Sequence, residues 1–547
     1  MKPLRRVFLF AAIIALLGLA VGGAASRARA SVGLPGCTSA TDWPMFGHDP
    51  GRSFSSPDSC IGTLGAATLR PKWFFNASAP VTAQPTVVGG TVYVGDFAGK
   101  FHALSATDGT ERWSFDIHKY DNNHTDYSAI DDSAAFTTIH GRHFIVFGGG
   151  ATLFVLDADN NGALVSSQCL DRVDTTCQGL NGYTTEIEAS PVLVPNGNGA
   201  QEILVGTDVN EHDPGGPTGL YDITLAPNGS LTPKWQFDPE TGVTSVGLPP
   251  AQPEPGNEHG CGDVWSSPAL VGNLVVFGDG NCDQPDQVQP SSVKPVEATF
   301  ALNVADGSVA WQATPHAPYT CDASGNCSGL DLDFGATANA LPSAAGAVVG
   351  EGGKDGVYYA YNRDGTLNWK TQVATASDIG GMIGSTAVGK LGSLHNNDPA
   401  VFAATAIPIS DIDPQTSLQN DLQHPGQAFG VHAIDAVTHQ VAWDAPVGPA
   451  YGAAVYNNGV VFVPDTFTDS LMALDADTGA ILRVQPLDAP PSSPVAISGN
   501  SLYMGAGTTE AGASATSDPT ALLTDPSGTA FGTLSGFGGV WGFTTTP

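Results

Sequence analysis

The sequence predicts an all-β, eight-bladed β-propeller whose ring is closed by an N-terminal strand. Three observations predict it. A phrase of short strands repeats along the chain, no apolar 3.6-residue period of useful length is present, and the two chain ends hold complementary parts of one repeat. With 547 residues, of which 41% are hydrophobic, the chain is long enough for one large all-β domain.

The repeated phrase contains a small residue and a proline, two β-rich segments, Ala-Leu-x-Ala, an Asp/Thr-Gly turn and a tryptophan. One copy runs from Gln84 to Trp113, and others end at Trp311, Trp369 and Trp443. Several short strands separated by turn residues describe a propeller blade, whose sheet packs face to face on its neighbours. We therefore expect the repeated tryptophans to pack blade against blade rather than to stack on a cofactor.

The chain ends determine the number of blades. Residues 72–75 form a lone strand around Trp73 with no blade before it, and the last repeat, from Ser493 to Gly505, lacks its own ending. We expect the N-terminal strand to complete that last blade. Outer strands are then expected near positions 73, 113, 165, 235, 311, 369, 443 and 483, which makes about eight blades.

The first residues have the pattern of a secretory signal. A basic start with Arg5 and Arg6 precedes an apolar run over residues 7–21 and a small-residue cleavage site at residues 28–30. We expect residues 1–30 to be a signal peptide and residues 31–547 to be a single propeller domain, located outside the cytoplasm. The alternative is an uncleaved anchor helix, because the apolar run is nearly long enough to span a membrane.

The charge balance excludes one class of partner. The chain has 53 acidic and 20 basic residues, a formal net charge of -33. Such a surface repels phosphate backbones, so we expect no nucleic-acid binding.

Eight cysteines in an exported chain predict disulfide bonds, although the sequence alone does not fix their connectivity. Short spacing favours two of the pairs and leaves two others: Cys169–Cys177 and Cys321–Cys327, then Cys37–Cys60 and Cys261–Cys282. No Cys-x-x-Cys-His motif is present, so no c-type haem is expected in this chain.

Residues 42–49, Asp-Trp-Pro-Met-Phe-Gly-His-Asp, together with Arg52 and the Trp73 strand, resemble the mature start of pyrroloquinoline quinone (PQQ)-dependent alcohol dehydrogenases, near the polyvinyl-alcohol dehydrogenase branch. The blade phrase with its tryptophan is similar to the packing motif of that family. The resemblance covers nearly all of residues 40–510 and implies the propeller of the quinoprotein alcohol dehydrogenase type. Non-catalytic propellers, including outer-membrane assembly scaffolds, share these blades, so the resemblance specifies the fold more than the activity.

The resemblance also implies a cofactor site. Glu211, Asn281 and Asp333 match the family's Ca²⁺ ligands. Trp265 matches the tryptophan that lies under the quinone, and Lys354 matches the cation that contacts it. A disulfide between the cysteines at positions 261 and 282 would brace the loops that carry Trp265 and Asn281.

These residue types suit alcohol oxidation. Ca²⁺ takes carboxylate and amide oxygens and polarises a quinone carbonyl as a Lewis acid. Asp333, which precedes an aromatic residue as in the family, would be the base that removes the alcohol proton, with Asp331 as the other candidate. Adjacent Ca²⁺ would keep Asp333 ionised, a fixed cation would stabilise the reduced quinone, and an indole offers a flat surface to a flat ring.

Two features of the family are missing. The adjacent cysteine pair is absent, and the corresponding stretch, residues 129–134, also lacks the usual arginine. The second face of a bound quinone would therefore be covered differently.

The function predicted from this resemblance is that of an exported quinoprotein oxidoreductase that oxidises a small or polymeric alcohol with PQQ and Ca²⁺. A separate electron acceptor is expected because no haem domain is fused to the chain. The alternatives are a non-catalytic binding or assembly scaffold and, less favoured, a propeller lyase or hydrolase. Convergence of Glu211, Asn281, Asp333 and Lys354 at one mouth of the central channel would distinguish the enzyme from the scaffold.

Overall fold

The structure is a computed structural model, and it describes most of the chain from residue 41 onward. The described residues are 41–58, 60–121, 130–178, 185–209, 218–250, 262–280, 297–316, 332–376, 381–406, 430–447, 450–466, 468–507 and 538–545, with the backbone of 320–321 and 327–328. The chain divides into two compact units, Met1–Gly36 and Cys37–Pro547, and the described residues belong to the second. Within them, no helix is both long and apolar enough to cross a membrane.

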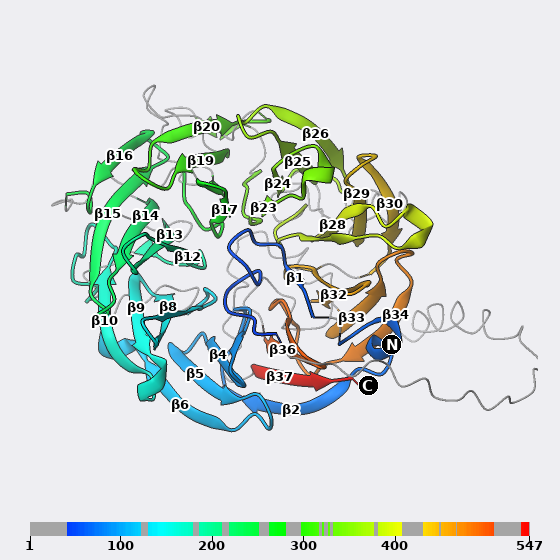
Figure 1. Ribbon diagram of the computed structural model, residues 1–547, viewed down its shortest axis with the longest axis horizontal. Helices are drawn as coiled ribbons and strands as arrows, with labels where there is room; N and C mark the ends of the chain where they lie inside the picture. The colour runs from blue at the N-terminus through cyan, green and yellow to red at the C-terminus, as the bar shows by residue number, and fades with distance from the viewer. Residues whose placement is uncertain are drawn as a thin grey trace, which may run out of the picture. The chain divides into compact units, whose positions relative to one another are not determined.

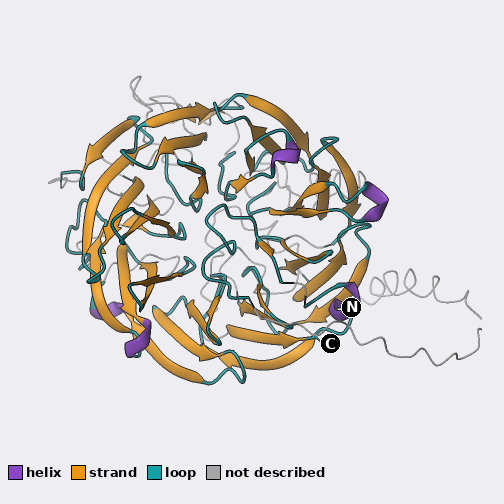
Figure 2. Cartoon of the chain, viewed as in Figure 1, coloured by secondary structure: helices purple, strands orange, loops and turns teal. Residues whose placement is uncertain are grey.

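Eight antiparallel sheets of this unit form the blades of a ring (Figures 1 and 2). In each blade the strand nearest the ring centre comes first, and the Trp-type strand lies at the outside (Figure 1). Helices are short, as the missing 3.6-residue period predicts. They are α2 (Thr63–Ala66) and the 3-10 turns η1 (Ile117–Lys119), η2 (Ala158–Asn160), η3 (Ser343–Ala345) and η4 (Ser393–His395).

The first four blades span residues 86–313. Blade 1 contains β3 (Thr86–Val88), β4 (Thr91–Gly95), β5 (Lys100–Ser105) and β6 (Glu111–Asp116). Blade 2 contains β7 (Ala135–Ile139), β8 (Arg142–Gly149), β9 (Thr152–Asp157) and β10 (Ala163–Cys169). Blade 3 contains β12 (Val192–Pro195), β13 (Gln201–Val209), β14 (Gly219–Leu225) and β15 (Leu231–Asp238), extended by β11 (Thr185–Glu186) and β16 (Val243–Val246). Blade 4 contains β17 (Ala269–Val271), β18 (Leu274–Gly278), β19 (Thr299–Asn303) and β20 (Val309–Ala313).

The other four blades complete the ring. Blade 5 contains β23 (Asn339–Ala340), β24 (Val349–Gly352), β25 (Val357–Tyr361) and β26 (Leu367–Gln372). Blade 6 contains β27 (Ala387–Lys390), β28 (Pro399–Ala404), β29 (Val431–Asp435) and β30 (Gln440–Ala445). Blade 7 contains β31 (Val455–Asn457), β32 (Val460–Asp465), β33 (Ser470–Asp475) and β34 (Ile481–Pro486), with β1 (Ser55–Ser56) paired to β31. Blade 8 contains β35 (Ala496–Ser498), β36 (Ser501–Ala506), β37 (Gly539–Thr544) and β2 (Arg70–Asn76). A separate hairpin joins β21 (Thr320–Cys321) to β22 (Cys327–Ser328).

Blade 8 closes the ring as predicted. The N-terminal strand β2 is its outer strand and pairs antiparallel with β37, so that Asn76 lies opposite Gly539 (Figure 1). The sequence analysis did not identify β37 itself, because it lies beyond residue 510 and carries none of the repeat phrase. The closing strand therefore joins the two ends of the domain through backbone hydrogen bonds.

At five of the blade interfaces, an outer tryptophan packs on a turn glycine of the next blade. A Cβ atom at Gly109 would lie 2.6 Å from the ring of Trp73, and one at Gly307 would lie 2.7 Å from the ring of Trp235. The same contact joins three further pairs: Trp113–Gly162, Trp311–Gly365 and Trp443–Gly479. These turn glycines all have positive φ, and each lacks the side chain that would displace the indole. The prediction that the repeated tryptophans are structural is confirmed.

The N-terminal segment 43–56 lies in the centre of the ring (Figure 1). Innermost strands of six blades donate backbone hydrogen bonds to its carbonyl groups: Val87 to Trp43, Phe136 to Pro44, Leu270 to Pro50, Ala340 to Gly51, Val388 to Ser53 and Tyr456 to Phe54. Arg52 is fully buried, and its guanidinium donates to the carbonyls of Pro268 (2.9 Å) and Ser190 (2.8 Å). Burial lowers the pKa of Arg52 to about 9. The motif that carries the family resemblance therefore organises the ring centre.

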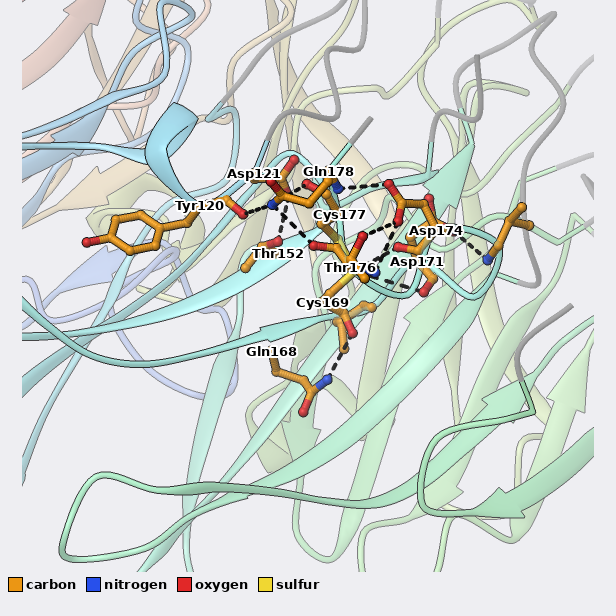
Figure 3. The surroundings of a disulfide bond; sticks show 12 residues. Tyr120, Asp121, Thr152, Gln168, Cys169, Asp171, Asp174, Thr176, Cys177 and Gln178 are labelled. Carbon is orange, nitrogen blue, oxygen red and sulfur yellow. Dashed lines mark hydrogen bonds between the residues drawn. A yellow bond between two sulfur atoms is a disulfide. The ribbon is translucent and has the colours of Figure 1, made fainter. Parts of the chain in front are cut away.

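The predicted disulfide between Cys169 and Cys177 is present (Figure 3). It closes a loop after β10 in which Asp171 and Asp174 accept backbone hydrogen bonds from Val173 (2.7 Å) and Gln178 (2.8 Å). This loop leads from the outer strand of blade 2 towards β11 of blade 3.

The other predicted disulfides are only partly described. Cys60 is disulfide-bonded, and its predicted partner, Cys37, lies outside the described residues. Cys321 and Cys327 are directly opposite one another in the β21–β22 hairpin. Cys261 and Cys282 also lie outside the described residues.

Candidate functional site

The segments that lead into the innermost strands of the blades lie on one face of the propeller, around one end of its central channel. We call this region the mouth. Each innermost strand begins at the edge where the next strand of the same blade ends, because the two are antiparallel. In six of the eight blades, an apolar residue of this segment packs on a glycine of the preceding blade. The pairs are Ile130 on Gly95, Ile187 on Gly148, Val264 on Gly206, Phe334 on Gly278, Met382 on Gly352 and Val81 on Gly505.

Three residues predicted for the cofactor site come together at the mouth. The Nζ atom of Lys354 lies 2.8 Å from Oδ2 of Asp333, and both side chains are buried. The same Nζ atom lies 5.6 Å from the ring centroid of Trp265. A cation, a carboxylate and an indole from blades 4 and 5 thus form one cluster.

Neighbouring residues hold this cluster in place. A Cβ atom at Gly335 would lie 1.6 Å from Cη2 of Trp265, so only glycine lets the indole occupy this position. Phe334 is fully buried and stacks on His316, with ring centroids 5.6 Å apart. Trp265 is partly exposed while Val264 and Ser266 on either side of it are buried. Trp265 is therefore more accessible than either of its neighbours in the chain.

The other two predicted ligands, Glu211 and Asn281, lie outside the described residues. Asp279, two residues before Asn281, is fully buried. One of its oxygens accepts a hydrogen bond from the backbone of Ala298 (2.5 Å), and Oδ2 has no hydrogen-bond partner among the described residues. Burial raises the pKa of Asp279 well above its usual value, and the nearby Asp333 raises it further.

A second group of carboxylates lies at the mouth in blade 3. Oxygen atoms of Glu186, Glu188 and Asp208 all lie within 4.8 Å of one another. Burial raises the pKa of Asp208 well above its usual value, and the charges of Glu186 and Asp263 raise it further. The sequence analysis missed this group. An alignment of the repeats could have found it, because Glu186, Glu188, Asp263 and Asp333 all flank the apolar residue that leads into a blade.

The stretch that lacks the family's arginine also carries acids. Asp132 accepts a hydrogen bond from the backbone of Gly148 (2.6 Å), and Asp131 accepts one from the hydroxyl of Thr82. Burial raises the pKa values of both aspartates. Acidic side chains therefore continue along the mouth from blade 2 to blade 5.

The fold of this chain recurs in solved structures. It is similar to quinohemoprotein alcohol dehydrogenases of Comamonas testosteroni (TM-score 0.60, 16% identity, 92% of this chain and 80% of that chain) and Pseudomonas putida HK5 (TM-score 0.59, 18% identity, 92% and 80%). It is also similar to a europium-containing methanol dehydrogenase (TM-score 0.59, 14% identity, 92% and 98%). A family model described as outer membrane protein assembly factor BamB, of the PQQ_2 type, matches residues 54–188.

By its fold, the chain is an eight-bladed β-propeller similar to those of the two quinohemoprotein alcohol dehydrogenases. No curated protein matches its sequence. The sequence identities of the chain to these three solved structures are 14–18%, so the similarity establishes only the architecture, and the chemistry must be argued from the residues at the mouth.

Proposed function

We propose that this propeller is an exported oxidoreductase that oxidises an alcohol with PQQ and Ca²⁺ and passes the electrons to a separate acceptor. The observation that carries the proposal is the contact of Lys354 with Asp333 (2.8 Å) beside the partly exposed Trp265. These residues were selected by resemblance from separate blades, and they form one cluster. A disulfide-containing domain is consistent with an oxidising compartment outside the cytoplasm.

Each residue of the cluster has a task in this chemistry. When bound, PQQ supplies a carbonyl that accepts hydride from the alcohol. Trp265 holds a flat ring by its accessible face, and Lys354 places a positive charge beside that ring. Asp333 accepts the hydroxyl proton of the alcohol and, with Glu211 and Asn281, would hold Ca²⁺.

The acidic residues around this cluster determine under which conditions PQQ could bind there. PQQ carries three carboxylate groups. In the described part of the mouth, the buried Asp263 lies two residues before Trp265, and the buried Asp208 is close enough to Asp263 for the two to interact electrostatically. Like charges that are poorly solvated repel strongly. The residues therefore fit an anionic quinone that binds together with metal cations, and they do not fit one that binds alone.

The experiment is reconstitution of the purified protein with PQQ and Ca²⁺, followed by absorbance and by dye-linked oxidation of a series of alcohols. The proposal expects bound PQQ and turnover in the wild-type protein, and loss of PQQ affinity in the Trp265→Ala and Lys354→Met variants. Lys370→Met is the matched control, because Lys370 lies in the same blade, 5.7 Å from the ring of Tyr359, and is exposed. Equal PQQ binding by all four proteins would exclude this site.

The second candidate is a non-catalytic binding or assembly scaffold. It is favoured by the acidic stretch at Asp131 and Asp132, where the resembling enzymes have an arginine and a cysteine pair nearby. Absence of PQQ binding to the wild-type protein with saturating Ca²⁺ would support the scaffold.

A further inference from the structure

We propose that Glu186, Glu188 and Asp208 of blade 3 form a second cation site, which takes a hard divalent cation of the Ca²⁺ class. Its three ligands are different residues from Glu211, Asn281 and Asp333, the ligands that the family resemblance implies. It does not depend on the proposed function, because it rests only on this chain's own carboxylates.

The backbone directs the three carboxylates towards one another. Strand β11 pairs antiparallel with β13, and Glu186 lies directly opposite Asp208. Such opposite residues have Cβ atoms about 4.5–5.5 Å apart and share one face of the sheet. Ile187 packs on Gly148 of blade 2, so the alternation of an extended chain turns Glu186 and Glu188 to the other side.

One oxygen of this group is left without a partner. The carboxylate of Asp208 accepts a hydrogen bond from the backbone of Glu188, whereas its Oδ1 atom is buried and has no hydrogen-bond partner among the described residues. Asp208 as a whole is only 6% exposed. A buried carboxylate oxygen without a donor is costly unless a proton or a cation meets it.

The arrangement is unfavourable without a positive charge. Like charges directly opposite in a sheet are destabilising, and the strongest charge effect on Asp208 comes from Glu186, another acid. Asp263 and Asp131 add further negative charge nearby. A bound divalent cation would neutralise most of this repulsion.

The donor set determines the class of cation. All three side chains offer oxygen, and neither histidine nor cysteine belongs to the group. Oxygen-only sites select hard cations, and Ca²⁺ accepts the irregular geometry and six to eight oxygens that carboxylates, carbonyls and waters can supply.

Calorimetric titration of Ca²⁺ into EDTA-stripped protein, without PQQ, tests the site. We expect Asp208→Asn to remove one bound Ca²⁺ per chain or to weaken it at least about tenfold, because a negatively charged ligand becomes a neutral amide while the shape is kept. Glu202→Gln is the matched control: Glu202 lies on the same strand, and its oxygens accept hydrogen bonds from Thr224 (2.7 Å) and Asn196 (3.1 Å). The control should bind Ca²⁺ as the wild-type protein does.

Two further variants separate this site from the other one and guard against a folding defect. Asp333→Asn should retain the Ca²⁺ of this site, so loss at the other site is recognised separately. Glu186→Gln replaces Asp208→Asn if the latter does not fold. Absence of Ca²⁺ binding in the wild-type protein, or unchanged Ca²⁺ binding in the folded Asp208→Asn or Glu186→Gln variant, would overturn the proposal.

Discussion

The segments that lead into the innermost strands divide the ring into an acidic half and a neutral half. The segments that lead into blades 2–5 carry Asp131, Asp132, Glu186, Glu188, Asp263 and Asp333. The corresponding segments of the other four blades, residues 381–386, 450–454, 489–495 and 80–85, contain no acidic residue. The apolar contacts between blades occur in both halves. Phe334 packs on Gly278 in the acidic half, and Val81 packs on Gly505 in the neutral half. Apolar packing therefore recurs around the ring because the fold requires it, whereas the acidic residues are confined to one half and are not required for the fold.

The largest expected effect concerns the base in the acidic half. Asp333→Asn keeps the shape of the side chain but cannot accept the alcohol proton. Positioned general-base catalysis contributes roughly 10²–10⁴ in rate, so turnover by the PQQ- and Ca²⁺-loaded protein should fall by about that factor. Stopped-flow or dye-linked kinetics measure it, with Asp331→Asn as the control. Wild-type turnover in Asp333→Asn together with an inactive Asp331→Asn would assign the role to Asp331.

The second prediction concerns the stability of the cluster. Lys354→Met leaves the buried Asp333 without its ionic partner, and breaking a buried pair costs about 3–5 kcal/mol. Urea unfolding should show this loss in Ca²⁺-free protein, whereas the double variant Lys354→Met/Asp333→Asn should recover much of it. Additive effects of the two substitutions would show that the pair is not coupled.

The third prediction concerns the loop after β10, which the Cys169–Cys177 disulfide closes. Replacing both cysteines of the Cys169–Cys177 bond with serine should lower the free energy of unfolding by about 2–4 kcal/mol, because the closed loop restricts the unfolded chain. Urea unfolding of the variant and of the wild-type protein measures the change. Identical unfolding midpoints would mean that Asp171 and Asp174 hold the loop without the disulfide.

The smallest expected effect tests the packing that both halves share. Gly109 and Gly90 lie in blade 1 with φ values of 73° and 74°, but only Gly109 faces an indole, that of Trp73. Both substitutions to alanine incur the backbone strain, and only Gly109→Ala overpacks the blade interface. Thermal or urea unfolding should show Gly109→Ala to be about 1–3 kcal/mol less stable than Gly90→Ala. Equal stabilities would contradict the tryptophan–glycine packing.

The sequence predicted the fold well because the fold is repetitive. Each blade must pack on two neighbours, so Trp73, Trp113, Trp235 and the turn glycines recur at fixed places in the repeat. Closure by the N-terminal strand followed from the unmatched Trp73 strand. Strand β37 was not predicted because its residues do not carry the repeat phrase. Its pairing with β2 and β36 makes it a strand.

The site was less predictable because it depends on contacts between blades. Resemblance selected Trp265, Asp333 and Lys354, and the structure places these three together. It could not indicate that Glu186 lies opposite Asp208, since that pairing depends on the short strand β11, which precedes the blade's regular strands. Glu186, Glu188 and Asp208 carry no recognisable motif in the sequence, and they form a candidate site only because the fold brings them together.

The most direct test of the account is the affinity for PQQ with and without Ca²⁺. Absorbance titration of PQQ into the EDTA-stripped protein and into the Ca²⁺-loaded protein gives both values. If cations neutralise the acidic half, Ca²⁺ should raise the PQQ affinity by about 5–150-fold, the usual range for coupled sites, and PQQ should raise the Ca²⁺ affinity equally. Equal PQQ affinities in EDTA and in Ca²⁺ would contradict the account.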